Sequence, residues 1–297
     1  MNIRQQSEAF LDSLQSRRRN PITSNTLSIY QSYLRTWIVP LVGGEDLAKF
    51  KNGAMRAFVA KLDQAGLAPA TIVGITGCLK SVIASALDEN GDSLYPHKWN
   101  NEFIDLPVVS PRDQKARTIG AQALSEAICG APGVYKPLYA TLAGTGLRIG
   151  ECLSLQAGTD DGKGTFWVPE QRTIVVRGQL QNGHFVAPKT PAGYRTVDLS
   201  DNLNDILRNV VRPAGYLFDV AESTAYEAAA KDGIPAFHSL RRFRVTRLRE
   251  VGTPEDILKY WIGHGSKDIS DRYSKLAQNE TLRKEWAERA GLGFTVD

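Results

Sequence analysis

Apolar side chains recur every three or four residues through much of the first ninety positions of the chain. This period is typical of amphipathic helices, in which one face packs against a core. It predicts four helices, whose apolar positions are Phe10, Leu11 and Leu14; Leu27, Tyr30, Leu34 and Trp37; Met55, Phe58, Val59 and Leu62; and Ile72, Ile75, Leu79, Val82, Ile83 and Ala86. Pro40 and Gly66 are expected to end the second and third helices. We therefore predict a compact bundle of four or five helices.

The pattern changes between Thr165 and Leu199. Four short runs, TFWV, RTIVVRG, HFVAPK and YRTVDL, are rich in β-branched residues or alternate between apolar and polar positions, and turns separate them. Such runs predict a small antiparallel sheet. Helical spacing occurs on both sides of it, at Leu124 and Ile128, from Leu138 to Leu155, and from Leu203 onward. The predicted fold class is mainly α with a small antiparallel β-sheet.

A segment of different composition separates the two halves. Residues 104–118, IDLPVVSPRDQKART, hold two prolines and mixed charges without a helical or alternating period, which is typical of a linker. We predict a helical domain over residues 1–103, a linker over 104–118 and a larger α+β domain over 119–297. The total of 297 residues agrees with this division, since domains average roughly 150 residues.

The composition narrows the possible classes of protein. The three cysteines are far apart and the four histidines include no HExxH motif, so neither a disulfide framework nor a metal site is expected. No run approaches the ~20 apolar residues that span a bilayer, and the first twenty residues lack the pattern of an export signal. We expect a cytoplasmic protein without a membrane partner.

One stretch is strongly basic, although the net charge of the chain is only +4. FHSLRRFRVTRLRE holds five arginines within nine residues, at Arg241, Arg242, Arg244, Arg247 and Arg249. A local positive surface on a nearly neutral protein suggests binding of a polyanion. A solvated helix face is the simpler alternative.

Three other polar residues stand out against apolar or glycine-rich surroundings. In GTGLRIGECLSL, Arg148 opens an apolar helix, where free N–H groups and a guanidinium would bind an anion. A buried pair between Arg148 and Glu151 is the alternative. His238 and Arg241 lie three residues apart and therefore share one helix face at the edge of the core. His264 lies in a Gly-His-Gly turn.

Lys189 and Tyr273 complete a set of polar residues with a distinctive order. Lys189 lies in the turn of HFVAPKTPAGYRTV, and Tyr273 follows His264 by nine residues. Order and spacing together resemble the tyrosine recombinase (phage integrase) family. The matching positions are Arg148 in TGLRIGE, Lys189 in a β-hairpin, His238-x-x-Arg241, Gly263-His264 and Tyr273. The chain departs from the family at Arg242, where many members have His, and at SKDISD, which precedes Tyr273 in place of a Thr-rich segment.

The resemblance covers nearly the whole chain. It implies a helical core-binding (SAM-like) domain followed by an α+β catalytic domain, with no additional arm-binding domain. It implies a site-specific DNA recombinase that cuts and rejoins strands through a covalent 3′-phosphotyrosyl intermediate, for integration and excision or for dimer resolution. A catalytically silent DNA-binding relative and a type IB topoisomerase-like enzyme are the alternatives.

The resemblance also implies roles for the matching residues. Tyr273 is expected to attack the phosphate, His238 to accept the tyrosine proton, and Lys189 to protonate the leaving 5′ oxygen. A second group is expected to surround the phosphate, with Arg148, Arg241 and His264 stabilising the transition state and Glu151 supporting Arg148 or His238. Because these groups supply the positive charge, no metal or other cofactor is expected.

The implied partner is double-stranded DNA, bound by a homotetramer, with no small-molecule substrate. Arg242 and Arg249 on the Arg-rich helix, and Lys80 and Lys98 in the first domain, are the candidate phosphate contacts. The last helix-like stretch, ETLRKEWAERAG, is expected to pack either on its own domain or on a neighbouring subunit.

Overall fold

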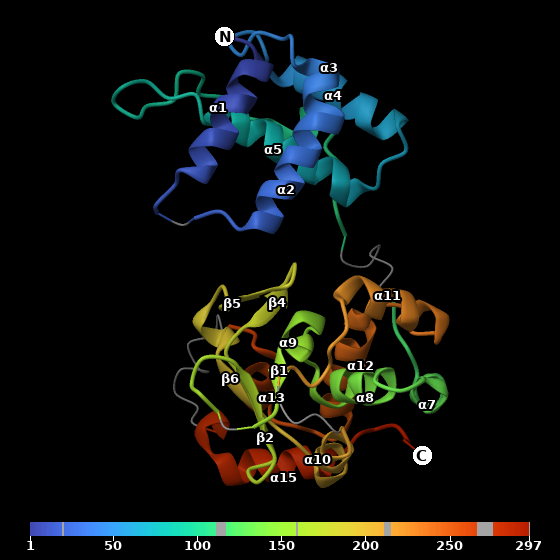
Figure 1. Ribbon diagram of the computed structural model, residues 1–297. Coiled ribbons are helices and arrows are strands. Elements are labelled where there is room, and N and C mark those ends of the chain that lie inside the picture. Colours follow the sequence, from blue (N-terminus) through green and yellow to red (C-terminus); the bar gives the residue numbers. More distant parts are fainter. Residues whose placement is uncertain (20, 111–116, 159, 211–214, 266–275, 297) are drawn as a thin grey trace. The chain divides into compact units, whose positions relative to one another are not determined.

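The computed structural model describes residues 1–297 apart from 20, 111–116, 159, 211–214, 266–275 and 297 (Figure 1). The chain forms two compact units, Met1–Lys115 and Ala116–Asp297, each with a buried apolar core of its own. The boundary between them lies inside the segment predicted as a linker. No helix among the described residues is long and apolar enough to cross a membrane.

The first unit is helical. Its elements are α1 (Ile3–Gln15), α2 (Ser24–Tyr33), the π-helical turn η1 (Leu34–Ile38), α3 (Val39–Val42), α4 (Asn52–Gln64), α5 (Pro69–Ala84) and α6 (Asn101–Ile104). Helix α5 is the most apolar of the longer helices, and α1, α2 and α4 all pack against it. The core of this unit therefore gathers around α5.

Two boundaries of the first unit differ from the expected ones. The helix expected to stop near Pro40 continues to Val42 through η1, in which the N–H of Val39 bonds to the carbonyl of Leu34. Proline is tolerated there because its missing N–H falls in the first turn of the next helical segment. Ile104, the first residue of the predicted linker, is fully buried in the core of this unit.

The second unit combines helices with short strands. Helices α7 (Ala121–Gly130), α8 (Tyr135–Thr145) and α9 (Ile149–Leu153) come first. The strands are β1 (Leu155–Gln156), β2 (Thr165–Val168), β3 (Thr173–Val176), β4 (Gln179–Gln181), β5 (His184–Val186) and β6 (Arg195–Asp198), with the 3₁₀ turn η2 (Pro191–Gly193) before β6. Then follow α10 (Asp201–Arg208), α11 (Glu222–Lys231), α12 (Phe237–Glu250), α13 (Glu255–Ile262), the 3₁₀ turn η3 (Leu276–Gln278) and α15 (Glu280–Ala290).

The strands form two sheets, where the sequence predicts one. One sheet has the order β1-β2-β3-β6, and β4 and β5 form a separate hairpin. β1 pairs with β2 in parallel, and the other pairs are antiparallel. The sequence predicts helix from Leu138 to Leu155, but Leu155 belongs to β1. The helix is interrupted at Gly146 and ends after Leu153.

A close approach of α13 to the end of α8 determines where the candidate site lies. Helix α8 ends at Gly146, whose φ of 73° lies in the left-handed region that favours glycine. A Cβ atom at this position would lie 2.7 Å from Cδ1 of Ile262. The backbone conformation favours glycine, and a side chain at this position would require the buried Ile262 side chain at the end of α13 to shift.

We predict that Gly146→Ala destabilises the protein more than Gly233→Ala, since Gly233 has φ 82° with open space around its Cα. Both variants should lose about 1–2 kcal/mol from the left-handed backbone. Gly146→Ala should lose roughly 1–3 kcal/mol more from overpacking against Ile262. Urea unfolding of the full chain measures both values, and equal losses in the two variants would contradict the assigned contact.

Candidate active site

Arg148 stands at the turn between α8 and α9 as the N-cap residue of α9. Its backbone N–H donates to Glu151 Oε2 over 2.8 Å, and its Nη1 donates to Glu151 Oε1 over 2.9 Å. The Arg148 side chain is nevertheless 46% exposed, whereas that of Glu151 is only 6% exposed. Arg148 is therefore both paired with Glu151, as one alternative expected, and open to solvent, as anion binding requires.

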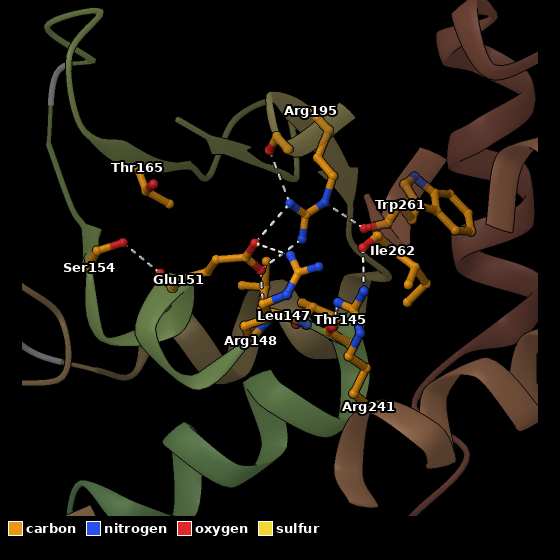
Figure 2. A network of polar contacts seen from close by, with 12 residues as sticks. Thr145, Leu147, Arg148, Glu151, Ser154, Thr165, Arg195, Arg241, Trp261 and Ile262 are labelled. Atoms are coloured by element: carbon orange, nitrogen blue, oxygen red, sulfur yellow. Dashed lines mark hydrogen bonds and ion pairs between the residues drawn. The ribbon is translucent and has the colours of Figure 1, made fainter. Parts of the chain in front are cut away.

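Arg195, the first residue of β6, was missed by the sequence analysis and is the hub of the network in Figure 2. Its side chain is fully buried. Nη2 donates to Glu151 Oε2 over 2.8 Å, Nη1 donates to Glu151 Oε1 over 3.1 Å, and Nε donates to the carbonyl of Trp261 over 2.7 Å. The only sequence signal for Arg195 was its position in YRTVDL, where alternation puts it on the same strand face as the buried Val197.

Glu151 holds its charge because two guanidinium groups surround it. Burial by itself raises the pKa of this carboxyl group. The hydrogen bonds and charge of Arg195, followed by those of Arg148, outweigh burial and leave the pKa below its ordinary value. Arg148, Arg195 and Glu151 together carry a net charge of +1. Because Arg195 is buried and Arg148 is exposed, this positive charge is open to solvent at Arg148.

Arg241, on α12, connects the same two parts of the chain a second time. It is buried, and it donates through Nη1 to the carbonyl of Gly146 over 2.6 Å and through Nη2 to the carbonyl of Ile262. Burial, followed by the charge of Arg148, lowers its pKa to about 10. The group is still protonated at neutral pH, so the site contains a second fixed guanidinium beside the first.

The two candidate histidines border this network from different elements. His238 lies in the first turn of α12, and His264 follows α13 directly after Gly263. Burial lowers the pKa of His238, and the charges of Arg242, Arg241 and Arg148 lower it further. Burial lowers the pKa of His264 as well, followed by Arg241, Arg148 and Arg195. The structure thus brings both histidines close to Arg148 and Arg241, and both are neutral at pH 7.

Lys189 is not joined to this network. It lies exposed between β5 and η2 and forms no hydrogen bond or ion pair with the other residues that the structure describes. The sequence predicts a β-hairpin around Lys189, but β5 pairs with β4 and β6 pairs with β3, so the two strands that flank it belong to different sheets. Lys189 therefore occupies a connection between sheets.

Tyr273 lies outside the described residues, but the elements on either side of it are both attached to Asp198 of β6. The indole N–H of Trp261, near the end of α13, donates to Asp198 Oδ2 over 2.8 Å. Nε of Arg283, on α15, donates to the same oxygen over 2.7 Å. Helix α15 also bonds back to its own unit, since the backbone N–H of Asp201 donates to Glu288.

The five arginines of α12 form neither one positive surface nor one solvated helix face, the two alternatives that the sequence left open. Arg244 is buried and donates to the carbonyl of Gly291, and Arg247 donates to the carbonyl of Ala290, so these two hold the end of α15. Arg242 is half-buried and donates to the carbonyl of Arg117. Arg249 is the most exposed, at 63%, and lies 3.6 Å from Glu255. The helical period distributes the guanidinium groups over several faces.

The two lysines proposed for DNA contact lie in the first unit. Lys80, on α5, donates to Asn101 Oδ1 over 2.8 Å and lies over the ring of Trp99, and burial lowers its pKa. Lys98 is exposed in the irregular segment before α6. Among the residues that are described, no group of His, Cys, Asp and Glu side chains is arranged to hold a metal ion.

Comparisons with known proteins find similarity in structure where they find none in sequence. No protein-family model and no curated protein matches the chain. The Tn1549 transposon integrase in complex with transposon right end DNA matches with a TM-score of 0.67 and 18% identity, over 94% of this chain and 99% of that one. A lambda integrase dimer bound to a COC′ core site matches with a TM-score of 0.61 and 15% identity, over 97% of this chain and 96% of that one.

Each comparison covers more than 90% of this chain, so the structural similarity includes both of its units. The fold class predicted from the sequence, mainly helical with a small amount of β-sheet in the second unit, is confirmed. The chain therefore has the fold of the integrases that resemble it in structure.

Proposed function

We propose that this protein is a site-specific DNA recombinase that cuts and rejoins strands through a covalent phosphotyrosyl intermediate. The observation that carries the proposal is one hydrogen-bond network at the end of α13, next to His264. Arg241 binds this helix end directly, and Arg148 is connected to it through Glu151 and Arg195. The site thus holds two guanidinium groups and a histidine, which come from separate elements and are fixed by one network. Such a set is suited to binding a phosphate. The integrases of similar fold are described in complex with DNA, among them the Tn1549 enzyme with circular intermediate DNA.

The reaction conserves the energy of the phosphodiester bond. The Tyr273 oxygen attacks phosphorus, forms a P–O bond to the enzyme and breaks the P–O5′ bond. The phenol proton passes to His238, and Lys189 supplies a proton to the 5′ oxygen. Attack by the 5′ hydroxyl of another strand reverses these steps and releases Tyr273.

The charge of the site matches what the transition state needs. Negative charge grows on the non-bridging phosphate oxygens as the fifth bond forms. Arg148 is exposed to bind them, and Arg241 adds a fixed positive charge and the N–H donors that its bonds to Gly146 and Ile262 do not use. His264, neutral at pH 7, donates an N–H, and His238, also neutral, has a nitrogen free of a proton to act as the base. Glu151 orients Arg148 without cancelling the positive charge.

We further propose that the active form is a homotetramer on DNA. A lambda integrase tetramer bound to a Holliday junction has a similar fold, with a TM-score of 0.62. Phosphate contacts from Arg242, Arg249, Lys80 and Lys98 are proposed to add to the affinity for DNA.

We predict that Tyr273→Phe abolishes the covalent protein–DNA adduct formed on a nicked suicide duplex and leaves DNA binding intact. Tyr226→Phe is the matched control, because it removes only the hydroxyl of a 46% exposed tyrosine in the same unit. The adduct is detected as a band of reduced mobility after denaturation. An adduct that persists in Tyr273→Phe would show that another residue is the nucleophile.

The wild-type protein distinguishes the two alternative functions. DNA binding by the wild type without any adduct would favour the catalytically silent relative, and plasmid relaxation by a monomer would favour the type IB topoisomerase-like enzyme.

We predict that Arg148→Lys lowers the rate of adduct formation about 10²–10³-fold, since a lysine keeps the charge but loses the fork that binds two phosphate oxygens. Arg208→Lys, on the exposed side of α10, should leave the rate unchanged. Rates are measured at saturating DNA so that weaker binding does not contribute. An Arg148→Lys rate within twofold of wild type contradicts the assignment.

The lowered pKa values of His238 and His264 predict the pH dependence of cleavage. A histidine with an ordinary pKa near 6.5 would begin to protonate below pH 7.5, whereas these two stay neutral to lower pH. At DNA concentrations well below saturation, where the rate reports the groups of the free protein, the rate should fall with a midpoint below pH 6.5. His184→Gln, a change on exposed β5, should give the same profile. A decline whose midpoint lies above 6.5 would be incompatible with neutral histidines at these positions.

A further inference from the structure

Arg195 encloses its charge almost completely within the protein. The guanidinium has five N–H donors, and four hydrogen bonds reach Glu151 twice, Trp261 once and Gly193 once. A charge with no exposed surface is strongly unfavourable unless each donor is satisfied. The protein satisfies four of the five donors, with a carboxylate and two carbonyl oxygens that all lie within 3.1 Å.

The partners of Arg195 belong to the two segments that carry the phosphate-binding groups. Glu151 binds both the backbone and the side chain of Arg148. The carbonyl of Trp261 stands at the end of α13, three residues before His264, where carbonyl groups lack helical partners and the helix dipole favours a cation. One planar group therefore links the position of Arg148 to that of His264.

The geometry around Gly263 shows how closely Arg195 fits against the chain. A Cβ atom at Gly263 would lie 3.0 Å from Nη1 of Arg195, and the φ of this residue is 67°. The turn that leads into His264 therefore folds directly onto the guanidinium. Arg241 donates to the adjacent carbonyl of Ile262, so two arginines hold consecutive carbonyls of the same helix end.

We propose that Arg195 is a positioning residue, which fixes Arg148 and His264 relative to one another without touching the DNA. This inference rests on the proposed function. A lysine could replace the charge but could not bind both carboxylate oxygens and a carbonyl at once, because its ammonium has no planar fork. Displacement of a reacting group by about 1 Å can slow a reaction about 10²-fold.

The test compares Arg195→Lys with Arg244→Lys, which changes a second buried arginine that holds the end of α15. The probe is a nicked duplex selected from a random-sequence library by binding to the wild-type protein. At a temperature where circular dichroism shows all variants folded, Arg195→Lys should form the adduct 10–100-fold more slowly, with DNA affinity within threefold of wild type. Arg244→Lys should keep the wild-type rate.

Two further measurements separate positioning from general stability. If Arg195 acts through Arg148, adding Arg195→Lys to Arg148→Lys should slow the reaction by less than threefold, so the two effects are not additive. Ring NMR can follow His264 without DNA, since the chain has four histidines, and Arg195→Met should raise its pKa while Arg195→Lys should not.

Distinct results overturn the inference and the proposed function. A folded Arg195→Lys protein that cleaves at the wild-type rate, a parallel loss of affinity and rate, or additive effects with Arg148→Lys would each overturn the positioning role. The absence of any adduct with the wild-type protein would instead contradict the proposed function. The titration of His264 still tests the link to Arg195 in that case.

Discussion

The second unit is organised around a carboxylate that has been removed from water. Glu151 lies between Arg148 and Arg195 and remains ionised only because both guanidinium groups compensate its burial. The arrangement brings together the start of α9 and the start of β6, and Nε of Arg195 extends it to the end of α13. Removal of Glu151 would leave the buried charge of Arg195 without a counter-charge, so the folding of the three elements is coupled through this carboxylate.

Strand β6 connects this network to helices α13 and α15 through the side chains at its two ends. Arg195 faces the candidate site, and Asp198, at the other end of the strand, binds Trp261 and Arg283. The same four residues of strand thus hold α13 by a backbone carbonyl and by an indole, and hold α15 by an ion pair. Because α15 is fixed in this way, it packs on its own unit in this structure, which is one of the two arrangements expected for the C-terminal helix.

The sequence predicted the positions of the helices, which depend on periodicity. It did not predict the orientation of single charged side chains or the pairing of the strands. Apolar spacing located α1, α4 and α5, because burial of a helix face needs a regular repeat. The spacing placed His238 and Arg241 at the edge of the core, but it did not show that Arg244 is buried as well. Arg195 was missed because its partner, Glu151, lies 44 residues away in the sequence. The separation of β4 and β5 from the main sheet depends on pairing, which alternation alone does not determine.

The contact between Gly146 and Ile262 has a consequence for how the chain can evolve. Both positions draw on one small volume, and the backbone around it is already fixed by Arg241 through the carbonyls of these same two residues. Any gain in size at one position has to be matched by a loss at the other. Among relatives of this protein, the two sites should therefore covary as a pair, with a smaller aliphatic residue on α13 wherever the turn after α8 carries a methyl group.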